Sequence, residues 1–251
     1  MALLAIDVGN TQTVFGLFEG DELRDHWRVA TDRNRSGDEL GALYGSFVDL
    51  DAVDGIALAS TVPQLHRSYE DFGMEYAKAE LLDIGPGVKT GVPIRYDDPR
   101  EVGPDRIANA VAAVERYGPP AIVVDFGTST NFDVVSPAGE YVGGVLAPGI
   151  EVSMDALFAR AARLFKVDFA EPETVIAKNT ASSLQSGLVY GFAGQVDGIV
   201  DRIRDELGAD AQTVATGGLA DLIVPHARTL ETIDPFLTLE GVRLVWLRNH
   251  D

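Results

Sequence analysis

The stretch LLAIDVGNTQTVF, residues 3–15, begins as an apolar run that stops at Asp7 and resumes at Thr13-Val14-Phe15. An unbroken run of Leu, Ala and Ile is typical of a buried strand. The turn between the runs, Gly9-Asn10-Thr11, combines small side chains with backbone N–H groups that no bulky side chain shields. These residues predict a strand, a tight turn able to bind an anion, and a second strand.

The same pattern occurs again about half the chain further on. The stretch AIVVDFGTSTNFDVV, residues 121–135, is an apolar strand ending in Asp125, followed by Gly127, Thr128 and a second strand-like run. In both halves a polar turn then leads to a third strand, at 23–29 and at 141–146. Asp and Gly are common in hairpin turns, so one such turn would carry little weight. Two at half-chain spacing predict a duplicated domain, with two anion sites facing each other across a cleft.

Strands and helices continue to alternate behind the first hairpin. Ser36-Gly37-Asp38-Glu39 predicts a capped helix that extends to about Val48. Strands are predicted near 55–60 and 80–84, with a helix at 65–78 between them. This order is typical of an RNase H-like α/β domain, in which helices flank a mixed sheet. We therefore predict two such domains, 1–117 and 118–251.

Composition restricts the classes of function. The chain has 251 residues, 46% of them hydrophobic, but no run approaches the ~18 consecutive apolar residues of a membrane helix. The first residues lack the features of an export signal, so we expect a soluble, cytoplasmic protein without a membrane partner. Cysteine is absent, which excludes disulfides, thiolate metal sites and a cysteine nucleophile, and the four histidines show no metal-ligand spacing.

The chain is strongly acidic. Its 39 acidic and 20 basic residues give a net charge of −19, which repels nucleic acid and acidic lipids, so neither is expected as a partner. The acidity fits adaptation to concentrated salt, and it fits equally well an ordinary cytosolic protein from a GC-rich genome. Any phosphate ligand would need bound cations and backbone N–H groups to neutralise it.

The stretch Gly103-Pro104-Asp105-Arg106 begins a predicted helix that places Asp105 and Asn109, four residues apart, on one face. Asp105 has two interpretations. Following Pro104, it suits the N-cap of the helix, which spacing alone favours. A carboxylate held at a helix start beside an Arg, after a Gly that admits close approach, also suits a general base.

In the second half, a helix is predicted over 154–165, with Leu157 and Leu164 facing inward. Beyond it, glycines are concentrated in two regions. Four glycines, Gly187, Gly191, Gly194 and Gly198, interrupt a helical pattern over 184–207. Each costs about 1 kcal/mol relative to Ala, so the row indicates either a dimer interface or a helix break. Gly217-Gly218 after a strand at 213–216 would let a flat ring lie on bare backbone, although most Gly pairs form ordinary turns.

Together these stretches resemble the type III pantothenate kinases of coenzyme A biosynthesis, in the superfamily of acetate kinase, sugar kinases, Hsp70 and actin. The turns at 7–11 and 125–128 would mark only the superfamily, whereas Gly103-Pro104-Asp105-Arg106 and Asn179-Thr180 narrow the resemblance to this branch. It covers nearly the whole chain, and the other stretches that carry it are Thr31-Asp32-Arg33-Asn34-Arg35, 143–149, Gln185-Ser186-Gly187, Gly217-Gly218-Leu219 and Leu237-Thr238-Leu239-Glu240-Gly241.

The resemblance implies the actin-like ATPase form of the RNase H-like fold. It implies phosphorylation of pantothenate to 4'-phosphopantothenate by ATP with Mg²⁺, the first step of coenzyme A biosynthesis. It further implies a monovalent cation, K⁺ or NH₄⁺, and a homodimer with its active site at the subunit interface. No Gly-x-x-x-x-Gly-Lys-Ser/Thr occurs, which excludes a Walker-type ATP site.

The resemblance also implies the role of each site residue. Asp105 would be the catalytic base that takes the proton from the primary hydroxyl, which reverses the preference for a cap. Asp125 would bind the monovalent cation, and Mg²⁺ would lie near Asp7. ATP would be bound by Asp7, Val8, Gly9, Asn10, Thr11, Gln12, Thr13, Val14 and Thr128, with Gly217 and Gly218 at the adenine. Pantothenate would be bound by Tyr96, Gly103, Pro104, Asp105, Arg106 and, from the second subunit, Thr180.

Two other functions stay open. A sugar or acetate kinase of the same superfamily shares both Asp-x-Gly turns, but it should be longer and lack Gly-Pro-Asp-Arg. A non-catalytic ATP-binding regulator is the second alternative, since members of the family have been described as transcriptional accessory proteins. The presence of Asp7, Asp105 and Asp125 favours an enzyme over this alternative.

Overall fold

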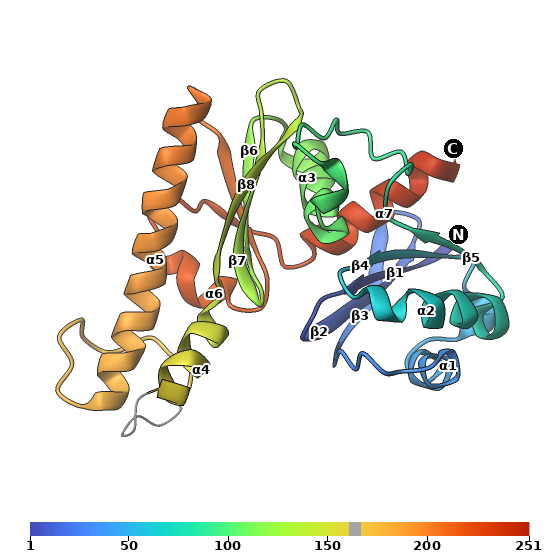
Figure 1. The fold of residues 1–251 in the computed structure, drawn as a ribbon, viewed down its shortest axis with the longest axis horizontal. Helices are drawn as coiled ribbons and strands as arrows, with labels where there is room; N and C mark the ends of the chain where they lie inside the picture. Colours follow the sequence, from blue (N-terminus) through green and yellow to red (C-terminus); the bar gives the residue numbers. More distant parts are fainter. Residues whose placement is uncertain (161–166, 251) are drawn as a thin grey trace. The chain divides into compact units, whose positions relative to one another are not determined.

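The computed structural model describes residues 1–160 and 167–250. It divides into two compact units, one formed by Met1–Ala112 with Leu237–Asp251 and the other by Ala113–Phe236. Figure 1 labels most of the elements of both units. The division falls within helix α3 (Pro104–Tyr117).

The first unit is built on a five-stranded mixed sheet in the order β3-β2-β1-β4-β5. The central strand β1 runs antiparallel to β2 and parallel to β4, so the carboxyl ends of β1 and β4 meet at one edge of the sheet. At that edge Asp7 pairs with Val14 on one side and with Ala59 on the other. The strands are β1 (Ala2–Val8), β2 (Gln12–Glu19), β3 (Glu22–Ala30), β4 (Gly55–Ser60) and β5 (Glu80–Asp83).

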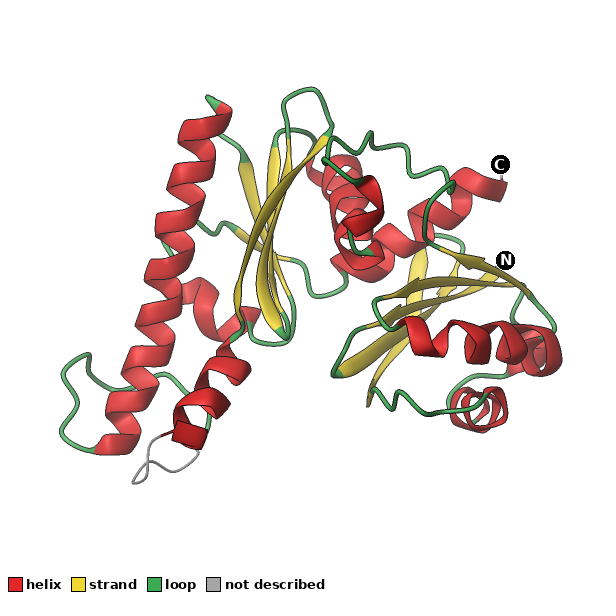
Figure 2. Cartoon of the chain, viewed as in Figure 1, coloured by secondary structure: helices red, strands yellow, loops and turns green. Residues whose placement is uncertain are grey.

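Helices cover both faces of this sheet (Figure 2). Helices α1 (Gly37–Gly45) and α2 (His66–Phe72) bury the face that carries Leu4, Ile6 and Phe15. The last helix, α7 (Leu237–His250), packs on β1, β2 and β4 from the other side, where Gly55 leaves room for the ring of Trp246. The predicted capping box at the start of α1 is confirmed, because Ser36 and Glu39 each accept from the other's backbone N–H.

The second unit repeats the architecture. Its sheet has the order β10-β9-β6-β7-β8, in which β6 runs antiparallel to β7 and parallel to β9, as β1 does to β2 and β4. The strands are β6 (Ala121–Phe126), β7 (Ser129–Val135), β8 (Tyr141–Pro148), β9 (Gln212–Thr216) and β10 (Thr232–Ile233). The matching strand order confirms the predicted duplication and the α/β fold class with two mixed sheets.

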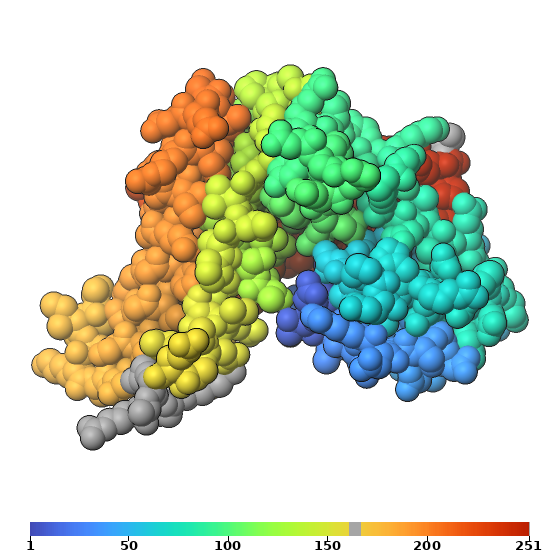
Figure 3. Space-filling model, viewed as in Figure 1, coloured from blue at the N-terminus to red at the C-terminus, as the bar shows by residue number. Residues whose placement is uncertain are grey.

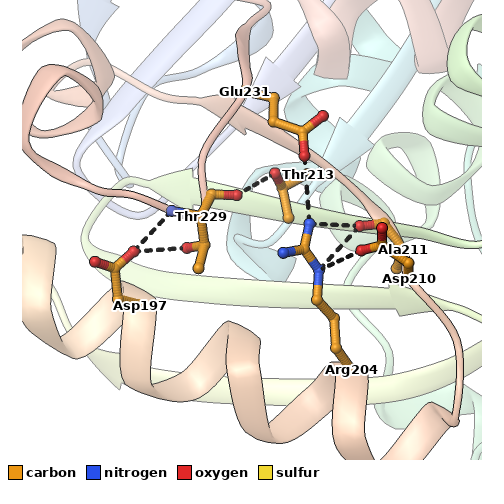
Figure 4. A network of polar contacts seen from close by, with 7 residues as sticks. All are labelled: Asp197, Arg204, Asp210, Ala211, Thr213, Thr229 and Glu231. Carbon is orange, nitrogen blue, oxygen red and sulfur yellow. Dashed lines mark hydrogen bonds and ion pairs between the residues drawn. The ribbon is translucent and has the colours of Figure 1, made fainter.

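The long helix α5 (Thr180–Leu207) is fastened to this sheet by a polar network (Figure 4). The carboxylate of Asp197 accepts hydrogen bonds from the backbone N–H and the hydroxyl of Thr229, both at 2.8 Å. The hydroxyl of Thr213 on β9 donates to the carbonyl of Thr229, and Arg204 donates to the carbonyl of Ala211 at 2.8 Å. The segment before β10 is thereby held to both α5 and β9.

The remaining elements are short. Helices α4 (Ile150–Arg160) and α6 (Ala220–Ile223) belong to the second unit. Single helical turns are formed by Leu50–Ala52, Pro63–Leu65, Gly73–Ala77, Pro99–Glu101 and Val224–His226. Across the described residues, no helix combines the length and the apolar character needed to cross a membrane.

Several elements differ from the sequence expectation. Helix α3 starts at Pro104, a residue that suits the first helical position, and the carbonyl of Gly103 accepts from the N–H of Ile107. Asp105 therefore lies inside the first turn and is not the N-cap. Helix α5 is continuous, which excludes a helix break at its glycines.

Two other differences concern the second half of the chain. The helix predicted over 154–165 starts earlier, at Ile150, and Leu157, expected inside, is 44% exposed; Leu164 lies outside the described residues. The predicted domain boundaries, 1–117 and 118–251, group α7 with the second half, whereas the compact units group it with the first sheet. These boundaries stay a prediction about independent domains.

Candidate active site

The turn between β1 and β2 presents open backbone. It is closed by a hydrogen bond from the N–H of Gly9 to the carbonyl of Gln12, at 3.0 Å. Asn10, Thr11 and Gln12 are exposed, while the strand residues on either side enter the sheet. A Cβ on Gly9 would lie 2.9 Å from the Gln12 carbonyl oxygen, so a side chain there would crowd the turn. The turn can therefore receive an anion on its backbone N–H groups.

A second segment supports this turn from behind. The N–H of Thr31 donates to the carbonyl of Thr11 at 3.0 Å, and its hydroxyl donates to the carbonyl of Gly9 at 2.8 Å. Thr13, predicted to bind ATP, is 3% exposed, and its hydroxyl lies 2.9 Å from that of Thr31. The side chain of Thr13 thus braces the turn from inside.

Arg33 adds a positive charge beside the turn. Its Nη2 donates to Oδ1 of Asn10 at 3.0 Å, and the side chain is exposed. Sequence reasoning included Arg33 in a family stretch but assigned it no role. The signal available in the sequence was an arginine two residues after the threonine that follows a hairpin strand.

The end of β1 is joined to the start of α3 through Thr61. The N–H and the hydroxyl of Thr61 both donate to the carbonyl of Val8, at 2.9 and 3.0 Å. A Cβ on Gly103 would lie 3.8 Å from Cγ2 of Thr61 and 3.5 Å from Cγ of Asp105. Gly103 is therefore the point where the Asp105 carboxyl folds back toward the edge of the sheet that carries Asp7. Thr61 was missed in the sequence, although it directly follows a parallel strand.

The Asp105 carboxyl combines a raised pKa with an acceptor atom that is shielded from solvent. Its Oδ1 is shielded from solvent and has no hydrogen-bond partner among the described residues. Burial raises the pKa of this carboxyl, and the nearby Arg106 charge and helix-start N–H groups lower it by less. Asp105 as a whole is only half-buried, so a ligand hydroxyl can approach its carboxylate, which is then able to take the proton of that hydroxyl.

In the second unit, Asp125 ends β6 beside a glycine turn. Gly217 has a φ of +92°, and a Cβ on it would lie 2.6 Å from Oδ1 of Asp125 and 2.6 Å from the N of Phe126. Only glycine fits this contact. The following turn, with Thr128 exposed, is packed against Gly149, where a Cβ would lie 2.6 Å from the Gly127 carbonyl oxygen. The structure thus places Gly217 against Asp125, and Gly149 against the turn that carries Thr128.

An additional acceptor lies next to Asp125. Asn131 on β7 pairs directly with Asp125 across the sheet. Oδ1 of Asn131 is buried without a hydrogen-bond partner in the parts of the chain that the structure describes. A carboxylate and an unused amide oxygen side by side fit a bound cation.

The other predicted residues are distributed over both units. Tyr96 is half-buried in the segment before α3, and Arg106 is only 7% exposed. Thr180 is exposed at the first position of α5, directly after Asn179, whose Oδ1 caps the helix by accepting from the N–H of Ser182 at 2.9 Å. Val8 is buried, Val14 and Pro104 are half-buried and Gly218 is exposed.

The sequence is closely similar to those of known proteins. A family model described as type III pantothenate kinase matches residues 3–202. A curated type III pantothenate kinase from Acidothermus cellulolyticus is 55% identical over 252 residues, which cover 98% of each chain. The chain belongs to the type III pantothenate kinase family. The two Asp-x-Gly turns and the Asp105 stretch therefore lie in a member of a kinase family, as the sequence predicted.

Solved structures agree on the fold at low identity. A Campylobacter jejuni protein assigned to the Baf family of transcriptional activators has a TM-score of 0.61 at 16% identity, covering 98% of both chains. A Listeria monocytogenes protein assigned as an N-acetylmannosamine kinase has a TM-score of 0.52 at 12% identity, covering all of both chains. These likenesses confirm the actin-like ATPase and sugar kinase fold predicted for this type III pantothenate kinase.

Proposed function

We propose that this chain phosphorylates the primary hydroxyl of pantothenate with ATP, the first step of coenzyme A biosynthesis, with Asp105 as the base. Membership of the type III pantothenate kinase family supports the reaction. The observation that carries the assignment of the base is the buried Oδ1 of Asp105, an acceptor without a partner in the described chain. Gly103, Pro104, Arg106 and Tyr96 lie in the same unit and would hold the pantothenate.

The reaction requires one proton transfer at the acceptor. Asp105 takes the proton from the hydroxyl oxygen as that oxygen forms a bond to the γ-phosphorus, and the bond between the γ-phosphorus and the bridging oxygen of ADP breaks. Burial favours this step, because a raised pKa makes the ionised carboxylate a stronger base. Phosphoryl transfer otherwise depends on positioning and charge neutralisation.

The phosphates of ATP would be bound by the turn at 9–12, beside which Arg33 and Arg28 supply positive charges through their hydrogen bonds to Asn10 and Gln12. Thr128 would add contacts from the second unit, and Gly217 and Gly218 would receive the adenine. The described residues contain no cluster of three or more His, Cys, Asp or Glu able to hold a metal ion. Mg²⁺ would therefore be held mainly by phosphate oxygens near Asp7, where it neutralises phosphate charge.

A monovalent cation would bind at Asp125. Its carboxylate and the unused Oδ1 of Asn131 are adjacent acceptors, as a K⁺ or NH₄⁺ site requires. Replacing Asp125 with Ala should therefore remove the cation requirement together with the activity.

A homodimer would complete the pantothenate site with Thr180 of the partner subunit. Several apolar side chains of the second unit are exposed, and the Cβ positions of Gly187, Gly191 and Gly194 face open space in the described structure. Helix α4 and the first part of α5, which carries these glycines, lie at the surface in Figure 3. Where such side chains form a contiguous patch, they mark a protein–protein contact. The exposed residues are Val142, Leu146, Val152, Leu157, Val175 and Ile176.

A coupled assay of ADP release tests the proposal. Purified protein receives Mg-ATP with pantothenate, in potassium chloride or in sodium chloride at matched ionic strength, with a hexose and acetate as control acceptors. We expect ADP release that depends on pantothenate and on potassium. Turnover with a control acceptor but not with pantothenate would contradict the substrate, and equal rates in both salts would contradict the cation site. We expect the activity in the cytoplasm, where ATP is abundant.

A further inference from the structure

The stretch Leu237-Thr238-Leu239-Glu240-Gly241 opens α7 and has no role in the reaction described above. Two of its residues contact α3 in the first unit. Gly241 lies so close that a Cβ would overlap the carbonyl of Ala108 and approach its Cα to 2.9 Å. One turn earlier, the hydroxyl of Thr238 donates to Oδ1 of Asn109 at 2.8 Å. The backbone of α7 is thus locked against the part of α3 that follows Asp105.

Asn109 is placed to act on Asp105. It is fully buried, and it lies four residues after Asp105, on the same face of α3. Helical side chains lean toward the N-terminus of their helix, which for Asn109 is the direction of Asp105. Thr238 binds the amide oxygen of Asn109 and so turns the amide N–H groups away from itself.

Two buried polar atoms in the first part of α3 lack a hydrogen-bond partner among the described residues. Nδ2 of Asn109 and Oδ1 of Asp105 are both shielded from solvent, and neither has a hydrogen-bond partner in the described part of the chain. One is a donor and the other an acceptor, so each is the chemical complement of the other. Catalytic hydrogen bonds are often long before the ligand is bound and shorten in the complex.

We propose that Thr238 and Asn109 are positioning residues for the catalytic base. Thr238 fixes the amide of Asn109, and the Asn109 N–H groups hold the Asp105 carboxylate, directly or through one water, in its ionised form facing the substrate hydroxyl. This inference rests on the proposed function, because it requires Asp105 to be the base. Among the described residues, the charge that acts on Asp105 is that of Arg106. Thr61, which approaches from the end of β4, is neutral.

The test compares Thr238→Val with Thr238→Ser. Valine keeps the shape of threonine but cannot donate a hydrogen bond, whereas serine keeps the hydroxyl. The rate constant kcat and the KM values for pantothenate and ATP are measured from about pH 5 to about pH 9, to cover both limbs of the profile. Rates are expressed per ATP-binding site, so that unfolded protein is not counted, and Thr238→Ala serves if the valine variant does not fold.

We expect the valine variant to lower kcat about tenfold, as expected for one charge-assisted hydrogen bond. The acid limb of its pH profile should move to higher pH, because the ionised carboxylate loses a donor, and the KM for ATP should not change. Serine should restore both properties. The proposal is overturned by a valine variant with a wild-type profile, or by a lower kcat with an unmoved acid limb, which would indicate packing alone.

A parallel measurement on Asp105→Asn distinguishes a wrong assignment of the base from the absence of the positioning role. If Asp105→Asn retains turnover, the base has been assigned wrongly and the positioning role fails with it. If Asp105→Asn is inactive while Thr238→Val behaves as wild type, the positioning role alone fails.

Discussion

At the scale of single residues, the burial of Asp105 has a measurable consequence for the pH dependence of activity. Its pKa is raised, mainly by burial, and the base works in its ionised form. Activity should therefore fall as the pH drops through this raised pKa, with an acid limb of kcat/KM above the ordinary Asp value of about 3.9. A pH–rate profile with pantothenate checks this, and an acid limb at or below the ordinary value would contradict the burial argument.

The same shift affects stability. A carboxyl whose pKa is raised in the folded state stabilises the fold below its unfolded pKa, and this contribution is lost as the pH rises through the folded pKa. Asp105→Asn carries no charge to bury, so at neutral pH it should unfold at a higher temperature than the wild type. The difference should close below about pH 4, where both side chains are neutral. Thermal unfolding at two pH values measures it, and an Asn variant that is less stable at neutral pH would count against a desolvated carboxylate.

Arg33 makes a separate prediction for nucleotide binding. It is exposed and donates to Asn10 in the turn that we propose binds phosphate. Arg33→Gln should raise the KM for ATP about three- to tenfold with little change in kcat, since it removes a charge that acts on bound phosphate. The effect should shrink at high salt. Arg67→Gln, which removes an exposed arginine from α2, is the matched control, and equal effects of the two would rule out a specific role for Arg33.

The site residues were predictable where chemistry and local sequence coincide. Asp7, Asp125 and the glycine turns stand out because each polar group directly ends an apolar strand. Thr61 and Asn131 were not predictable in the same way, since their roles depend on the sheet register that places them beside Asp105 and Asp125. The burial of Thr13 was not predictable either. Its position beside the turn suggested an exposed hydroxyl, whereas in the structure that hydroxyl pairs with the hydroxyl of Thr31.

At the scale of elements, the attachment of α5 to its sheet depends on Asp197. This carboxylate accepts from Thr229 twice and from the N–H of Arg228. Asp197→Ala should lower the free energy of unfolding by about 1–3 kcal/mol, because it leaves backbone and hydroxyl donors unpaired. Asp201→Ala, which removes only an exposed pair with Arg228, should change it by less than about 1 kcal/mol. Urea unfolding of both variants makes the comparison, and equal losses would show that the network does not hold the segment.

The elements themselves were predicted best where periodicity is local. The hairpin strands and the capped helix α1 follow directly from alternation and from the capping box at Ser36. The placement of α7 was not predictable, because its apolar residues match a sheet formed some two hundred positions earlier in the chain. Leu157 on α4 likewise satisfied a helical pattern, yet within the described residues it remains exposed.

At the scale of the whole molecule, the open glycine face of α5 predicts the oligomeric state. In a monomer, a larger residue at Gly191 would only stabilise an exposed helix, by about 1 kcal/mol in the case of Ala. In a dimer packed on this face it would block the contact. If the chain forms the proposed homodimer, Gly191→Leu should convert a dimer of twice 26.9 kDa into a monomer. Turnover should also fall, because the proposed contribution of Thr180 from the partner subunit would be lost.

Light scattering coupled to gel filtration measures the mass. Ala42→Leu, an exposed change on α1 of the first unit, is the control and should stay dimeric. A wild-type protein that is monomeric while fully active would contradict the predicted contribution of the second subunit.

The assignment of Asp105 as the base for phosphoryl transfer to pantothenate can be tested on a single variant. Pantothenate-dependent ADP release is compared between the wild type and Asp105→Asn, with ATP binding measured on the same samples by calorimetry. We expect the Asn variant to bind ATP normally and to lose at least about a hundredfold in turnover, the lower range for a general base. An Asn variant that turns over pantothenate within a few-fold of the wild type would contradict the claim.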